Sequence, residues 1–343
     1  MPATVRKFVI AVVKLGLLLA LLIAIGGVVA WRQFEAFANA PAGAPAGGTL
    51  VVAPGDSFVQ VLGKLRAAGV TSGHDLAWKA LATRMQALPR LQVGEYALDP
   101  RLTPRAIIEK LVRGDVVRHR FTIVEGWSMR DLRAAIDRDA VLDDDIASLD
   151  DAGLMAALGR ADVPAEGRFL PETYLFTRGE TALSLLDQAA DAMDVALADA
   201  WNARSADTPL ESPEQLLTLA SIIEKETGKA SERPEIAGVF VRRLRLGMKL
   251  QTDPTVIYGL GTAFDGNLRR VHLRTDTPFN TYTRFGLPPH AIAMPGRAAL
   301  MAAAQPLEGE TLFFVARGDG SHQFSRTYAE HRAAVVRYQL GGR

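Results

Sequence analysis

The sequence contains no cysteine among its 343 residues. Disulfide bonds, zinc sites with cysteine ligands and thiol catalysis are therefore excluded. The chain also lacks an excess of charge of either sign, because 39 lysines and arginines stand against 38 aspartates and glutamates. Nucleic-acid-binding proteins carry a basic patch, so no nucleic-acid partner is expected.

Common catalytic motifs are missing as well. The six histidines are scattered without the spacing of a zinc site, and we interpret His322 and His331 as surface or hairpin residues. No G-x-S-x-G motif provides a serine nucleophile. The stretch GLGTAFDG lacks the lysine of a phosphate-binding loop and the context of a dinucleotide site. We therefore expect neither a metal nor a cofactor.

One long apolar run stands at the N-terminus, over residues 8–31, and is interrupted only by Lys14. A bilayer core about 30 Å thick needs roughly 20 helical residues, so this run predicts a single-pass transmembrane helix. Arg6, Lys7 and Lys14 precede most of the run, whereas only Arg32 follows it closely. By the positive-inside rule, the N-terminus lies in the cytoplasm and the body in the periplasm.

A cleaved signal peptide is the alternative interpretation of this run. Ala38, Asn39 and Ala40 form a cleavage site of the required small-residue type. However, Pro41 would follow the cut, and its ring restricts the scissile bond. The apolar run is also long for a signal peptide, so a retained anchor in the cytoplasmic membrane is favoured.

Composition and periodicity then predict an α+β chain with two folded parts. Residues 49–118 alternate strand-like and helical patterns, as in a small α/β module, with Thr103 and Pro104 opening one helix and Gly114 closing it. The larger part is mainly helical with short β elements, including a hairpin and a closing helix near the C-terminus. The expected boundaries are a cytoplasmic tail 1–7, a transmembrane helix 8–31, a Pro/Ala/Gly linker 32–48, the module 49–118 and the larger domain 119–343.

The stretch LASIIEKETG, residues 219–228, carries two glutamates on a predicted helix that begins after the cap Ser212. At 100° per residue, Glu224 and Glu226 lie at opposite borders of the apolar stripe, so they do not face each other. If a cleft opens along one border, that carboxyl is desolvated and becomes a candidate general acid. The alternative is that both are solvated charges at the rim of the helix.

Two segments downstream, LQTDPTVIYGLG and FNTYTRFGLPPHAIAMPG, place polar and aromatic side chains among proline and glycine turns. Proline and glycine hold such loops in defined shapes. Polar groups beside aromatic rings suit sugars, which present hydroxyls at their edges and an apolar face. Purely structural turns are the alternative.

The chain resembles the endolytic murein transglycosylases, or YceG-like family, over residues 49 to about 335. The resemblance is carried by segments in the family's order: VVAPGDS, LQVGEYAL, TIVEGWS, EGRFLPETYLF, LASIIEKET, LRLGMKLQTDPTVIYGLG, FNTYTRFGLPPHAI and GSHQFSRTYAEH. A single-pass anchor also fits the family. One departure is His290, which stands where the family usually carries a small residue.

The resemblance implies a peptidoglycan lytic transglycosylase in which Glu224, the first glutamate of the E-K-E-T motif, is catalytic. Residues 49–118 would be a LysM-like module that binds glycan strands, and peptidoglycan synthases would be further partners. Cleavage of the bond between N-acetylmuramic acid and N-acetylglucosamine would leave 1,6-anhydro ends and terminate nascent strands. The implied substrate-binding residues around the cleft are Glu226, Gln251, Thr252, Asp253, Tyr258, Asn280, Thr281 and Tyr282.

Two other functions stay open. A hydrolytic muramidase would need a second carboxylate to activate water, and Asp253 is the candidate. A catalytically silent scaffold would use the module and the anchor to recruit wall-synthesis enzymes. A lytic transglycosylase needs only one carboxyl, because the muramyl C6 hydroxyl replaces water as the nucleophile.

Overall fold

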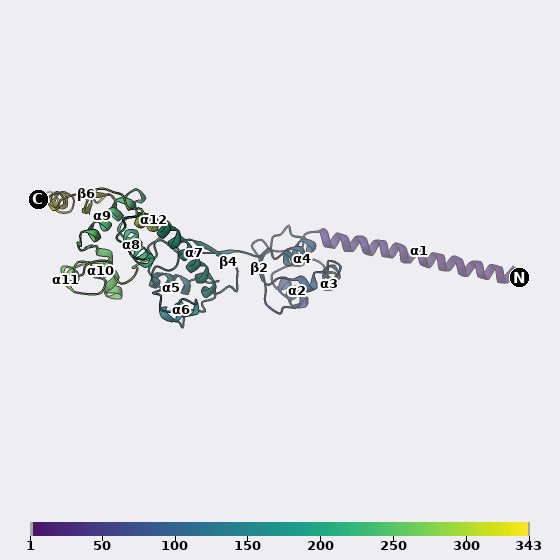
Figure 1. The fold of residues 1–343 in the computed structure, drawn as a ribbon. Coiled ribbons are helices and arrows are strands. Elements are labelled where there is room, and N and C mark those ends of the chain that lie inside the picture. Colours follow the sequence, from purple (N-terminus) through teal and green to yellow (C-terminus); the bar gives the residue numbers. More distant parts are fainter. Residues whose placement is uncertain (1–2, 342–343) are drawn as a thin grey trace. The chain divides into compact units, whose positions relative to one another are not determined.

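The computed structural model describes residues 3–341, and the chain divides into two compact units, Met1–Arg118 and His119–Arg343 (Figure 1). The first unit contains α1 (Ala3–Asn39), β1 (Thr49–Val52), α2 (Phe58–Ala67), α3 (Asp75–Arg84), η1 (Leu88–Arg90), β2 (Gly94–Ala97) and α4 (Pro104–Arg113).

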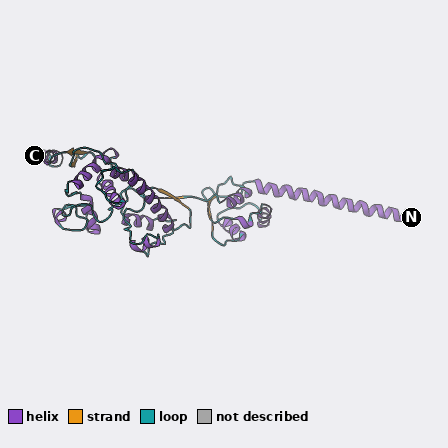
Figure 2. Ribbon diagram, viewed as in Figure 1, coloured by secondary structure: helices purple, strands orange, loops and turns teal. Residues whose placement is uncertain are grey.

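The second unit is mainly helical, and its few strands are short (Figure 2). Its elements are β3 (His119–Thr122), α5 (Met129–Asp137), α6 (Asp151–Ala157), β4 (Thr173–Phe176), α7 (Ala182–Asn202), α8 (Pro213–Glu226), η2 (Ala230–Glu232), α9 (Arg233–Arg245), α10 (Asp253–Leu260), η3 (Gly261–Ala263), α11 (Arg270–Arg274), α12 (Arg297–Ala304), β5 (Phe313–Ala316), β6 (His322–Ser325) and α13 (Tyr328–Tyr338). The prediction of a mixed, mainly helical chain is confirmed.

The N-terminal helix α1 is one unbroken helix of 37 residues (Figure 1). Its apolar part is long enough to cross a membrane, and none of the apolar window is buried against the rest of the chain. Its C-terminal end, in contrast, packs on the first unit: the ring of Phe37 meets that of Trp78 edge-on at 5.8 Å. The carboxylate of Glu35 also pairs with Arg84 at 2.5 Å and with Arg105 at 3.0 Å.

The segment 32–48, expected as a Pro/Ala/Gly linker, is helical in its first part and contributes small side chains to the core. The helix continues to Asn39, and Ala38, Ala42 and Ala44 are buried in the core of the first unit. Residue 42 also exchanges backbone hydrogen bonds with two distant parts of the unit, donating to the Leu102 carbonyl at 2.8 Å and accepting from the Ser72 amide at 3.1 Å. Small side chains permit this close approach of the backbones, which composition alone does not reveal.

The rest of the first unit has the chain order β1, α2, α3, β2, α4. Strands β1 and β2 pair antiparallel, with Thr49 opposite Ala97 and Val52 opposite Gly94. Local signals set the helix ends as predicted, since Thr103 caps α4 and Gly114 follows it at φ 68°, a left-handed conformation that favours glycine. Helix α3, which the sequence patterns did not single out, contributes the fully buried Trp78.

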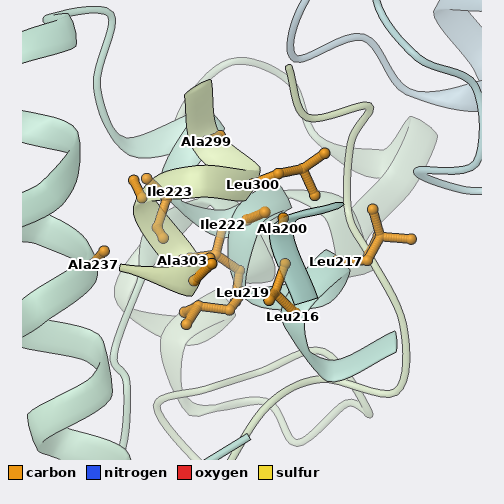
Figure 3. Close-up of a cluster of buried hydrophobic side chains, with 14 of the residues drawn as sticks. Ala200, Leu216, Leu217, Leu219, Ile222, Ile223, Ala237, Ala299, Leu300 and Ala303 are labelled. Carbon is orange, nitrogen blue, oxygen red and sulfur yellow. The ribbon is translucent and has the colours of Figure 1, made fainter. Parts of the chain in front are cut away.

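Helix α8 is the centre of the second unit. Its residues 216–223 are all buried, and α12, α9 and α7 pack around it. Figure 3 shows the side chains of α8 lying among Ala237 of α9, Ala200 of α7 and a row on α12 that comprises Ala299, Leu300 and Ala303. Because the core holds this helix on several sides, the residues at its C-terminal end are held in place.

Candidate active site

The two glutamates of α8 lie in different surroundings. The carboxylate of Glu224 is almost fully enclosed, with 4% of its side chain exposed. Its Oε1 lies 3.1 Å from Nη2 of Arg233, and its Oε2 accepts a hydrogen bond from the Gly296 amide at 2.9 Å. Both oxygens of Glu224 are therefore engaged by the protein itself.

Glu226, two residues later, faces a pocket of about 410 Å³, here called the Glu226 pocket. Its walls come from α8, α9, the loop before α10, the β5–β6 hairpin and α13, and its lining includes Glu226, Arg243, Gln251, Asp253, Tyr282, Phe313, Phe314, His322, Tyr328 and His331. Within the described chain, Glu224 does not line this pocket.

The pKa of the Glu226 carboxyl is raised to about 7. Burial is the main cause, and the negative charge of Asp253 adds to it. A hydrogen bond from the Thr252 hydroxyl to Oε1 and the positive charge of Arg243 act in the opposite direction. A carboxyl in this state holds its proton near neutral pH, as a general acid must.

The loop that faces Glu226 has an unusual backbone. Gln251 adopts φ 52°, in the left-handed region that non-glycine residues rarely occupy. The loop is held there by residue 281, whose carbonyl accepts from the Gln251 amide at 3.2 Å and whose hydroxyl accepts from the Thr252 amide at 3.1 Å. Strain of this kind concentrates at functional sites. Here the strained residue directly precedes Thr252, whose hydroxyl donates a hydrogen bond to Glu226.

The segment 280–282 has a structural part and a part that reaches the pocket. Asn280 is 1% exposed, and its side-chain amide donates to the Thr275 carbonyl at 2.7 Å, which closes the loop. Its Oδ1 accepts from the amide of Tyr282 at 2.9 Å. The Tyr282 hydroxyl then donates to Oδ1 of Asp253 at 2.5 Å, and both of these side chains line the Glu226 pocket.

Tyr258 belongs to a different pocket, of about 800 Å³, here called the Glu166 pocket. Glu166 is 7% exposed there, accepts hydrogen bonds from the Met129 amide at 3.1 and 3.2 Å, and is hydrogen-bonded by the Tyr258 hydroxyl. Burial raises the pKa of Glu166 to about 7. This carboxyl is the second acid candidate in the unit.

The two pockets are lined by residues that are neighbours in the sequence. Lys225 lines the Glu166 pocket, whereas the following residue, Glu226, lines the other. At the start of α10, Asp253 lines the Glu226 pocket and Pro254 lines the Glu166 pocket. The end of α8 and the start of α10 therefore separate the two hollows.

His290, which stands where a small residue was expected, contacts Tyr258, a residue that lines the Glu166 pocket. Its ring packs on Phe279 at 4.9 Å and on Tyr258 at 5.9 Å, and its Nδ1 lies 2.7 Å from the Ala291 carbonyl oxygen. The residue thus supports the aromatic ring of Tyr258.

The sequence patterns did not single out two of the residues around these pockets, Glu166 and Arg243. Arg243 is 8% exposed, and its guanidinium donates to the carbonyls of Leu312 and Leu250, both at 2.7 Å. His322 lies on the hairpin strand β6, as one of the two expected alternatives, and only 11% of its side chain is exposed. Its contacts join segments 90 residues apart, which periodicity cannot detect.

Comparison with known proteins identifies the family. The profile of the YceG-like family matches residues 50–337. The chain belongs to the YceG-like family. Among its relatives, the endolytic murein transglycosylase of Bacillus subtilis is 33% identical over 264 residues, which cover 72% of this chain and 73% of the relative.

Two further relatives agree with this family assignment. The endolytic murein transglycosylase of Streptococcus pneumoniae strain D39 is 29% identical over 185 residues, half of this chain but only 32% of that longer protein. The crystal structure of a YceG-like protein from Listeria monocytogenes superposes with a TM-score of 0.53 at 27% identity, covering 83% of this chain and 97% of that one.

Proposed function

We propose that this YceG-like protein is a membrane-anchored endolytic murein transglycosylase, which cleaves the glycan strands of peptidoglycan internally. Family membership and the names of the relatives support the reaction. The observation that carries the assignment of the site is one carboxyl, Glu226, whose pKa is raised to about 7 at the wall of a polar and aromatic pocket.

Glu226, rather than Glu224, is the proposed proton donor. In the first step its proton passes to the oxygen that leaves N-acetylmuramic acid C1, and the C1–O4 bond breaks. In the second step the muramyl C6 hydroxyl closes on C1, and its proton returns to the Glu226 carboxylate. The product is a 1,6-anhydro end, no water is consumed, and the acid is regenerated.

The surroundings of Glu224 support this choice over the motif-based prediction. Arg233 and the Gly296 amide occupy both oxygens of the Glu224 carboxylate, and Glu224 is absent from the described residues that line the Glu226 pocket. Glu224 is better suited to holding Arg233 and the Gly296 turn in place. We assign it a structural role.

A hydrolytic muramidase is the second candidate function, because Asp253 shares the pocket with Glu226. The Tyr282 hydroxyl that bonds Asp253 leaves part of that carboxylate available for water. Mass spectrometry of sacculi digested by the purified full-length protein separates the two reactions. We expect anhydro ends, each one water lighter than a hydrolysed end, whereas hydrated ends would establish hydrolysis.

The anchor and the first unit complete the proposal. The charges around the apolar part of α1 orient the N-terminus to the cytoplasm and both folded units to the periplasm. The β1, α2, α3, β2 order with an antiparallel strand pair supports a LysM-like glycan-binding module. Protease protection in spheroplasts tests the orientation: the folded units should be digested from outside, and protection of these units would contradict it.

A further inference from the structure

A carboxylate and an imidazole form a buried pair at the wall of the Glu226 pocket. Glu232, at the end of η2, is 9% exposed, and the His322 side chain on β6 is 11% exposed. Oε2 of Glu232 lies 2.7 Å from Nδ1 of His322, and Oε1 accepts from the His322 backbone amide at 3.3 Å. Two contacts from one carboxylate therefore hold both the ring and the backbone of this residue.

The pair leaves one nitrogen of the imidazole for the pocket. Burial opposes ionisation of Glu232, but hydrogen bonds from His322 and Lys229 outweigh it and lower the pKa of this carboxyl. An ionised Glu232 accepts the Nδ1 proton, and in the neutral tautomer that carries its proton on Nδ1 the other nitrogen, Nε2, is an acceptor. Nε2 makes no hydrogen bond within residues 3–341, and His322 lines the Glu226 pocket.

Aromatic contacts fix the plane of the ring as well. The ring of Phe314 meets His322 edge-on at 5.4 Å, and that of Phe324 lies 6.4 Å away. A side chain fixed by a carboxylate on one nitrogen and by rings on its flanks has little rotational freedom left. Such outer partners orient functional imidazoles in many sites.

We propose that His322, oriented by Glu232, is a positioning residue whose Nε2 accepts a hydrogen bond from a hydroxyl of the bound glycan. This inference rests on the proposed function of the Glu226 pocket. Protonation of the ring turns Nε2 from an acceptor into a donor, so the contact is lost in acid. Glu226 must be protonated while His322 must be neutral, and activity should therefore decline on both sides of an optimum.

Other charged and titratable groups surround His322. Lys229 pairs with Glu232 at 3.0 Å. The pocket itself adds groups from α8, α9, α10 and α13 and from the 282 loop: Glu226, Arg243, Asp253, Tyr282, Tyr328 and His331. A variant at position 322 alone isolates the contribution of the imidazole.

Two substitutions at this position separate the two nitrogens. In His322→Asn the amide stands near the place of Nδ1, so the contact with Glu232 is kept and the acceptor in the pocket is removed. In His322→Gln the amide reaches the place of Nε2, so an acceptor that cannot titrate is kept. A third variant, Glu232→Gln, tests the orienting carboxylate, and His272→Asn on α11 is the control for a histidine outside both pockets.

The measurement is kcat and KM of the full-length protein on a defined glycan between pH 5 and 9, with thermal unfolding of each variant. We expect His322→Asn to lose about tenfold in kcat/KM, the scale of one hydrogen bond. His322→Gln should retain most activity, and both variants should lose the acid limb. Glu232→Gln should weaken activity less than His322→Asn, and the control should match the wild type.

Two results would overturn the proposal. An unchanged pH profile in His322→Asn would show that the ring does not contact the glycan. Equal losses in both His322 variants, together with a lower melting temperature, would show a purely structural role. Failure of the proposed function is recognised separately: the wild-type protein would not cleave the glycan, or Glu226→Gln would remain active whatever the His322 variants do.

Discussion

The two glutamates at the borders of helix α8 differ in whether other groups of the protein occupy their carboxyl oxygens. At one border, both carboxylate oxygens of Glu224 accept hydrogen bonds, from Arg233 and from the Gly296 amide, and only 4% of the side chain is exposed. At the other border, Glu226 accepts one hydrogen bond from the Thr252 hydroxyl and lines the Glu226 pocket, and burial raises the pKa of its carboxyl to about 7. Two residues in a helix are about 200° apart, so one motif can contain a structural and a chemical carboxyl.

The difference between Glu224 and Glu226 predicts its largest effect on the rate of glycan cleavage. Glu226→Gln keeps the size of the side chain and removes the transferable proton, so kcat should fall by about 10³-fold or more. Glu224→Gln should cost less than about tenfold per folded molecule, because its carboxyl transfers no proton. Turnover of both purified proteins on the same glycan checks this, with circular dichroism as the control for folding. A reversed order would move the acid to Glu224.

The second prediction concerns stability at the closed border. Glu224→Ala leaves the Arg233 guanidinium, which is 12% exposed, without its nearest carboxylate. Breaking a buried ion pair on one side typically costs about 3–5 kcal/mol, so the free energy of unfolding should fall on that scale. Glu125, 3.6 Å from Arg233, compensates in part. Urea unfolding followed by tryptophan fluorescence measures the change; a loss below 1 kcal/mol would be typical of a solvated pair and would refute the structural role.

The third prediction concerns the pH dependence of stability at the open border. The folded-state pKa of Glu226, about 7, lies above its ordinary value of 4.5. The folded protein therefore keeps a proton that the unfolded chain releases, and stability falls as pH rises from 4.5 to 7. Each pKa unit of this difference costs about 1.4 kcal/mol of stability above pH 7. The free energy of unfolding of Glu226→Gln should therefore be higher than that of the wild type at pH 8 and similar to it at pH 4. Equal pH profiles for the two proteins would contradict the raised pKa.

The smallest effect is expected at Thr252, whose hydroxyl lowers the pKa of Glu226. The Thr252 hydroxyl donates to Glu226 and lowers its pKa, so Thr252→Val should raise that pKa further. The alkaline limb of the kcat/KM profile should then move to higher pH, by up to about one unit. Val keeps the shape of the side chain, which makes it a matched control for packing. A shift to lower pH would show that the hydroxyl stabilises the protonated form instead.

Local signals predicted several elements of this fold correctly. Ser212 caps α8, accepting from the Gln215 amide at 3.3 Å, and Thr103 with Gly114 bounds α4. The Gln215 side chain does not complete a capping box at Ser212, because it accepts from the Glu211 amide instead. Caps and turns act over three or four residues, and these distances are visible in a sequence.

Features that depend on distant contacts could not be predicted in this way. The burial of Ala38 follows from packing of the first unit on α1, and no periodicity announces it. The choice between Glu224 and Glu226 depends on Arg233, Gly296 and Thr252, which meet the helix only in the folded chain. A helical wheel separates the two borders correctly, but it does not say which border is open.

The most direct test of this account is the protonation state of Glu226. Infrared difference spectra between the wild-type protein and Glu226→Gln, recorded from pH 4 to 9, isolate the carbonyl stretch of this one carboxylic acid. We predict that the signal of the protonated acid persists to near neutral pH and disappears with a midpoint close to 7. A midpoint near the ordinary value of 4.5 would leave Glu226 ionised at neutral pH and contradict its role as the general acid.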